Sequence, residues 1–176
     1  MCSGTAKRLL SFLAGLVLCN PALVSAQERL DFADTPDGRR SFPELLINAG
    51  GTGFAGLATI YNGQPVIFYD VVWVRKMGGL DSPMFAFVRA HEYGHHRRGH
   101  VTQQYRTPPQ MMVMLGYQSE LDADCWAVHT LRDNGDDAAV RAAFDLYAQT
   151  VPLQDSQGRP GTARRHAEMR RCLASR

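Results

Sequence analysis

The sequence predicts an α+β fold in which a small β-sheet precedes a helical carboxy-terminal half. Two observations indicate this order. Runs rich in β-branched and aromatic residues end near residue 74, and segments with helix start and stop signals follow from residue 81 onward. With 176 residues, of which 45% are hydrophobic and 20% charged, the chain has the composition of one globular domain.

The first 26 residues are typical of a targeting segment. Lys7 and Arg8 precede an apolar run at 9–18, and Val24-Ser25-Ala26 provides small residues at a cleavage site. The run is shorter than the roughly 20 apolar residues that span a bilayer, and no later stretch is long enough. We therefore expect a signal peptide at 1–26 and an exported domain at 27–176, periplasmic or secreted, with no integral membrane segment.

The charge of the exported domain is balanced. The leader holds two of the 19 basic residues and none of the 17 acidic ones, which leaves 17 of each sign. A balanced domain has little long-range field to attract nucleic acid or an anionic membrane, so neither is expected as a partner.

The first part of this domain carries weak signals. Residues 27–43 are polar and are expected to form an exposed lead-in with weak structural preference, whereas 44–48 fit either a short helix or a strand. The glycine-rich run at 50–53 predicts a loop, and its spacing matches no nucleotide-binding fingerprint.

Two β-rich runs, 57–61 and 65–69, flank Asn62-Gly63, a dipeptide that favours a tight hairpin turn because both positions tolerate positive φ. The second run is expected to stay extended through Val74. Pro65 cannot donate to a sheet ladder, so the start of its strand is expected at an edge or a bulge, where an extended peptide could bind.

Four helices are expected after the sheet. Ser82 and Pro83 supply a cap and a first-turn proline for a helix that runs to about Arg98 and stops at Gly99. Similar signals place the other helices at about 110–134, 136–149 and 162–173.

The segment His91-Glu92-Tyr93-Gly94-His95 lies inside the first of these helices. Residues four apart share one helix face, about 6 Å apart along the axis, so both imidazoles can hold one metal ion. Glu92 lies beside that face, where its carboxylate can reach a metal-activated water without binding the metal. His96 points about 100° away and His100 follows Gly99, so solvated or supporting roles are favoured for both.

A second motif, Glu120-Leu121-Asp122-Ala123-Asp124, places two carboxylates on one face of the next helix, while Asp122 should point elsewhere. Alone it would be typical of an exposed acidic turn. The order His-Glu-x-x-His, then Glu-x-x-Ala-Asp, resembles the gluzincin metallopeptidases, most closely the minigluzincins, over roughly residues 57–135. This resemblance implies that Glu120 is the third zinc ligand and that Asp124 orients a ligand histidine.

The resemblance also implies a function. One Zn²⁺ per chain would activate water for peptide-bond hydrolysis, with Glu92 as the general base and the polypeptide substrate bound as an extended strand. The run at 65–70 is similar to the substrate-binding edge strand of these enzymes. An oxyanion donor is also needed, and Arg159, His166 and Tyr117 are the candidates, while Arg165 matches an arginine that often follows in this family.

A second class of function stays open, in which the domain binds metal but acts without proteolysis as an assembly or chaperone-like factor for envelope polypeptides. The presence of Glu92 favours the peptidase, because binding alone would not require it. A purely structural zinc site is less favoured, since such sites usually have four protein ligands.

Cleavage of the leader would remove Cys2 and Cys19 and leave Cys125 and Cys172. An even pair in an exported domain predicts a disulfide, and two separate buried thiols are the alternative.

Overall fold

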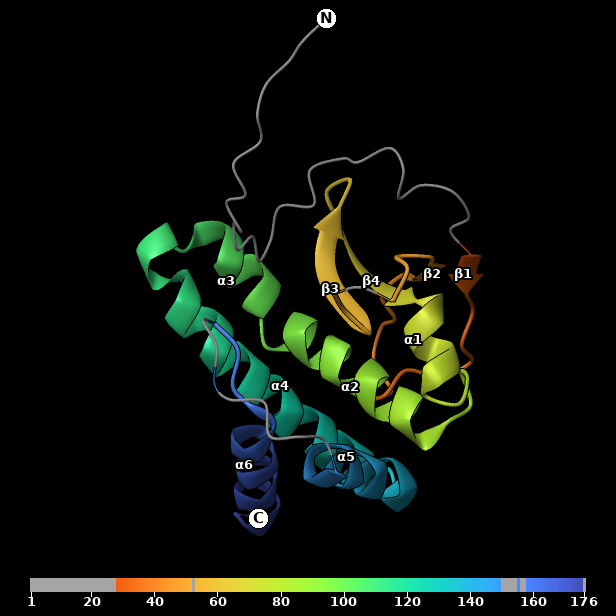
Figure 1. Ribbon diagram of the computed structural model, residues 1–176. Helices are drawn as coiled ribbons and strands as arrows, with labels where there is room; N and C mark the ends of the chain where they lie inside the picture. Colours follow the sequence, from red (N-terminus) through yellow and green to blue (C-terminus); the bar gives the residue numbers. More distant parts are fainter. Residues whose placement is uncertain (1–27, 52, 150–154, 156–157, 176) are drawn as a thin grey trace, which may run out of the picture.

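The computed structural model describes residues 28–51, 53–149, 155 and 158–175, so the predicted leader lies outside the described residues. The fold is α+β, as predicted: a four-stranded sheet comes first and helices make up the rest of the described chain (Figure 1). None of the described helices is long and apolar enough to cross a membrane.

The sheet is mixed, with strand order β1-β2-β4-β3. Its strands are β1 (Glu28–Leu30), β2 (Glu44–Ile47), β3 (Gly56–Tyr61) and β4 (Gln64–Asp70). β2 runs parallel to β4, and the other two pairs are antiparallel. β3 is therefore an edge strand, and β4 lies between two neighbours.

The described part of the polar lead-in has more structure than the sequence indicated. β1 pairs with β2, and Asp37 accepts two hydrogen bonds from the Arg97 guanidinium, 2.6 and 3.0 Å long. The backbone carbonyl of Pro36 also accepts from Asn134, 98 residues away. These partners are distant in sequence, which is why local composition gave no signal for them.

The β3–β4 hairpin confirms the predicted turn, because Asn62 and Gly63 have φ values of 50° and 76°. Pro65 opposes Ile60, and β2 begins to pair with β4 only at Ile67, so the missing N–H of Pro65 interrupts no ladder. The prediction that 65–70 forms the exposed edge strand is wrong, since the open edge belongs to β3.

The run that follows β4 is a helix, α1 (Val71–Lys76), and the expected extension of the strand to Val74 is wrong. The buried carboxylate of Asp70 provides the physical reason. It caps α1 by accepting from the Val72 N–H, and it also accepts from Ala49 and Gly51 across the neighbouring loop.

The helical half begins with α2 (Pro83–Arg97), whose first turn is capped by the Ser82 hydroxyl accepting from the Phe85 N–H. Gly99, with φ 78°, ends that helix as predicted, but a short unpredicted helix starts at once. The remaining elements are α3 (His100–Arg106), the 3-10 turn η2 (Pro109–Met111), α4 (Met112–Asp133), α5 (Asp137–Gln149) and α6 (Thr162–Ala174).

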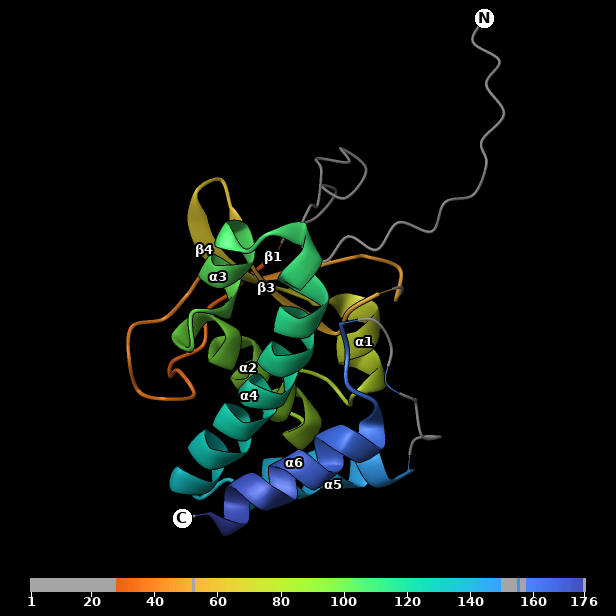
Figure 2. The same ribbon diagram turned by 90° about the vertical axis from the view of Figure 1, so that its left-hand side faces the viewer.

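Helix α2 lies between the sheet and the other long helices (Figures 1 and 2). Apolar clusters cover it on both sides, one formed with the sheet and one with α4, α5 and α6. Close approach to α4 depends on Gly94, because a Cβ there would lie 3.2 Å from the Ala123 carbonyl oxygen and 3.3 Å from the Trp126 ring. The two motifs of the sequence therefore face each other across this contact.

Candidate metal centre

Three side chains from α2 and α4 bring one donor atom each to a common point. The Nε2 atoms of His91 and His95 lie 3.0 Å apart. One carboxylate oxygen of Glu120 lies 3.6 Å from the His91 nitrogen, and the other lies 3.6 Å from the His95 nitrogen. Donors at 2.0–2.1 Å from a tetrahedral metal would be about 3.3 Å apart, which these separations bracket. Two imidazole nitrogens and one carboxylate oxygen at this spacing fit a single divalent cation.

Asp124 orients the first histidine from behind. Its carboxylate is fully buried and accepts from His91 Nδ1 at 2.8 Å, so the lone pair of His91 is on Nε2, toward the other donors. Burial would lower the pKa of His91, but the hydrogen bond to Asp124 and its charge raise it. Burial and the nearby charges of His91 and His100 hold the pKa of His95 well below its ordinary value.

Glu92 is the acid of the site that does not join the donors. Burial raises the pKa of its carboxyl to about 7, although the charge of His91 and a hydrogen bond from the Ala58 N–H oppose this. That hydrogen bond is 2.7 Å long and joins α2 to the edge strand β3. Gly56 on the same strand leaves room for the side chain, since a Cβ there would lie 2.6 Å from the Glu92 Cγ.

Arg165 of α6 is the basic residue of the site. Its guanidinium donates to both oxygens of Asp124 at 2.6 and 2.7 Å, and it lies 3.3 Å from a Glu120 oxygen. It also stacks against the ring of Tyr147, 4.9 Å from the ring centre. Burial would lower the pKa of Arg165, but the charge of Asp124 keeps it well above its ordinary value.

The three predicted oxyanion donors contact residues other than the three metal donors and Glu92. Tyr117 donates its hydroxyl to Asp155, His166 packs edge-on against Phe144, and Arg159 is exposed. None of the three forms a hydrogen bond or ion pair with the donors or with Glu92. The oxyanion role of these three residues stays a prediction, because such a donor faces the substrate. The one signal in the sequence for Arg165 was its match to the later arginine of the family pattern.

The other histidines of the first motif do not join the three donors. His96 hydrogen-bonds the Val66 carbonyl of β4 at 3.0 Å. His100 lies 3.2 Å from His95 through their Nδ1 atoms, and its Nε2 lies 3.0 Å from Asp122. Asp122 points away from the donors, as predicted.

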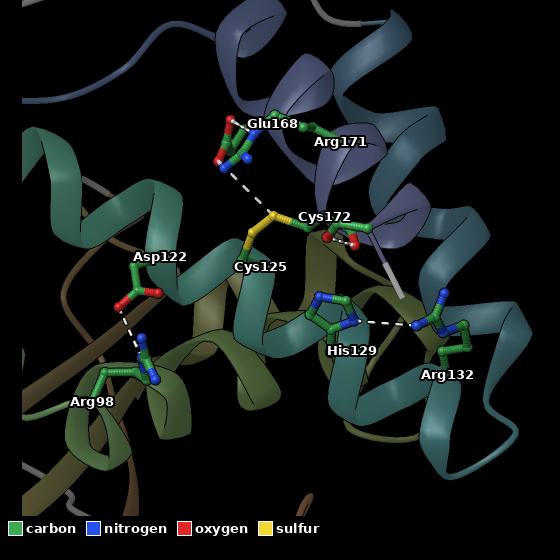
Figure 3. Close-up of a disulfide and its surroundings, with 9 residues drawn as sticks. Arg98, Asp122, Cys125, His129, Arg132, Glu168, Arg171 and Cys172 are labelled. Atoms are coloured by element: carbon green, nitrogen blue, oxygen red, sulfur yellow. Dashed lines mark hydrogen bonds and ion pairs between the residues drawn. A yellow bond between two sulfur atoms is a disulfide. The ribbon is translucent and has the colours of Figure 1, made fainter.

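The predicted disulfide joins Cys125 of α4 to Cys172 of α6, with Cα atoms 5.7 Å apart (Figure 3). It links the helix that carries Glu120 and Asp124 to the helix that carries Arg165. Glu168 lies beside the two sulfurs, but because the sulfurs are bonded to each other, no thiolate is left there to bind a metal.

No protein-family model, curated protein or solved structure matches the chain.

Proposed function

We propose that this protein is an exported zinc-dependent metalloendopeptidase. The observation that carries the proposal is the buried carboxyl group of Glu92, which lies beside three metal donors and does not join them. A carboxyl group in that position can take a proton from a metal-activated water. A site that only held a metal for structure would have no need of such a carboxyl group.

The donor set favours zinc. Two imidazoles and one carboxylate, with a fourth position left for water or substrate, are the ligands typical of catalytic zinc. When bound there, zinc would supply Lewis acidity, lowering the pKa of a water molecule and polarising a peptide carbonyl. The same donors would accept other transition metals, so the choice of zinc also rests on the resemblance to gluzincins.

The side chains around the donors have separate tasks in this proposal. Glu92 accepts a proton from the attacking water and returns it to the leaving amine. Asp124 fixes the tautomer and direction of His91. Arg165 balances the negative charge of a region where the carboxyl groups of Glu92, Glu120 and Asp124 gather. Burial would raise the pKa of Asp124, but the charge of Arg165 and its hydrogen bond lower it.

The edge strand β3 is the proposed docking site for substrate. The Ala58 N–H is directed toward Glu92, away from β4. Because alternate residues of a strand direct their main-chain groups to the same side, Gly56 and Ile60 share this orientation. An extended polypeptide would add to this edge as a further strand, with its scissile bond near Glu92.

The metal proposal is tested by elemental analysis of the purified protein. We expect about one zinc per chain, and Glu120→Ala should lose most of it. Full zinc content in Glu120→Ala would move the third ligand elsewhere.

The peptidase proposal is tested with a diverse library of fluorogenic peptides. Glu92→Gln should keep the zinc but lose at least about 100-fold of the hydrolysis rate, because it removes the base. Glu28→Gln, an exposed change of the same chemistry on β1, is the matched control and should cleave like the wild type. Zinc binding without cleavage of any peptide would favour the non-proteolytic binding function instead.

A further inference from the structure

We propose that His100 and Asp122 form a relay that positions the metal ligand His95, as Asp124 positions His91. This inference rests on the proposed metal centre but not on peptidase activity. It makes specific the role of His100, for which the sequence favoured a solvated or supporting one, and gives a role to an acid that points away from the donors.

The contacts of the relay are continuous. His95 Nδ1 lies 3.2 Å from His100 Nδ1, His100 Nε2 lies 3.0 Å from an Asp122 oxygen, and Arg98 donates to that oxygen at 2.9 Å. Both imidazoles are buried, with 8% and 5% of their surfaces exposed. Both ring nitrogens of His100 thus have partners inside the protein. Asp122 in turn pairs with Arg98, an ion pair that Figure 3 shows between α4 and the end of α2.

When His95 binds a metal, the hydrogen bonds of the relay can run in one order only, with each donor farther from Asp122 than its acceptor. His95 faces the other donors through Nε2, so its proton must be on Nδ1. That N–H can donate only to an unprotonated Nδ1 of His100, which places the His100 proton on Nε2. Asp122 is an acceptor there, and the same oxygen also accepts from the Arg98 guanidinium.

The two ligand histidines therefore receive comparable support from one helix. Asp122 and Asp124 both belong to α4 and lie two residues apart, so they leave the helix on nearly opposite sides. Asp124 reaches His91 directly, whereas Asp122 reaches His95 through an imidazole. The left-handed Gly99 makes this arrangement possible, because it ends α2 and starts α3 with His100 beneath His95.

The outer end of the relay opens to solvent. Arg98, His100 and Asp122 line a cavity of about 400 Å³ between α3 and α4, and the Asp122 side chain is 31% exposed. Water that enters this cavity can partly replace a lost Asp122 contact, whereas the contact between His95 and His100 is buried in the protein. Loss of His100 should therefore have the larger effect on metal binding.

The test uses cobalt(II) bound to the purified protein, which makes the ring protons of metal-bound histidines visible as shifted NMR signals. We expect two slowly exchanging N–H signals in the wild type, one from each ligand histidine. His100→Ala should speed the exchange of one signal, leave the other, and weaken cobalt affinity by about 10 to 100-fold. His100→Asn retains an acceptor near the position of Nδ1 and should recover much of both properties.

His96→Ala is the matched control, because it also removes an imidazole, half-buried here, that has a hydrogen bond to the protein, to the Val66 carbonyl. It should leave cobalt affinity and both N–H signals unchanged. Wild-type affinity and exchange in His100→Ala would overturn the relay while leaving the metal centre intact. If the wild type bound no cobalt, the metal centre and the relay would both be overturned.

Discussion

Replacing Glu92 by glutamine should remove a specific pH dependence from the stability of the metal-free protein. Burial raises the pKa of this carboxyl from its ordinary 4.5 to about 7, so folding favours its neutral form. A group with a raised pKa in the folded state stabilises the protein at low pH, and this stabilisation is lost as the pH rises from 4.5 to 7. Glutamine cannot ionise and can still accept the hydrogen bond from Ala58.

The magnitude follows from the two pKa values. A tenfold change in proton affinity is worth about 1.4 kcal/mol, so the full effect of a pKa of about 7 instead of 4.5 is about 3 kcal/mol. Most of this change, about 2 to 3 kcal/mol, is expected between pH 5 and pH 8. The free energy of unfolding of Glu92→Gln should therefore rise by that amount relative to the wild type over this pH range.

The assay is urea denaturation of chelator-treated wild type, Glu92→Gln and the exposed control Glu28→Gln at several pH values. Glu28→Gln removes one carboxyl group from the exposed surface of β1 and so controls for the change in net charge. Adding zinc should move the Glu92 transition to lower pH, because a nearby cation favours the carboxylate. A constant difference between wild type and Glu92→Gln from pH 5 to pH 8 would refute the reasoning.

The other predictions concern stability. Asp124→Ala leaves the buried charge of Arg165 without its main partner and should lower the free energy of unfolding by about 3 to 5 kcal/mol. Adding Arg165→Met should recover part of that loss in a double-mutant cycle, and strictly additive losses would contradict the pairing. Replacing both Cys125 and Cys172 by serine removes a link between residues 47 apart and should lower the free energy of unfolding, measured by denaturation, by about 4 kcal/mol. Two freely alkylated thiols in the oxidised wild type would contradict the disulfide itself. Gly94→Val should cost about 1 to 3 kcal/mol because its side chain meets α4, and an unchanged melting temperature would show that the helices can separate without penalty.

Local geometry explains what could be predicted from the sequence. The shared face of His91 and His95 depends only on the repeat of one helix, and so does that of Glu120 and Asp124. The hairpin turn at Asn62-Gly63 likewise depends on the φ preferences of adjacent residues, and the start of α2 depends on Ser82 and Pro83. The α+β order followed from the same local signals.

Strand order and long-range contacts could be decided only by the tertiary structure. β3 rather than β4 is an edge strand because β2, which comes earlier in the sequence, pairs with the other side of β4. No local pattern specifies this arrangement. Arg165 rather than Arg159 or His166 lies against Asp124, 41 residues away in the sequence.

The contacts of His100 with His95 and with Asp122 of another helix were likewise decided by the tertiary structure. The physical reason is common to these cases. Spacing within one helix or turn is set by backbone geometry, whereas contacts between elements depend on how their buried surfaces pack, and that is a property of the whole chain.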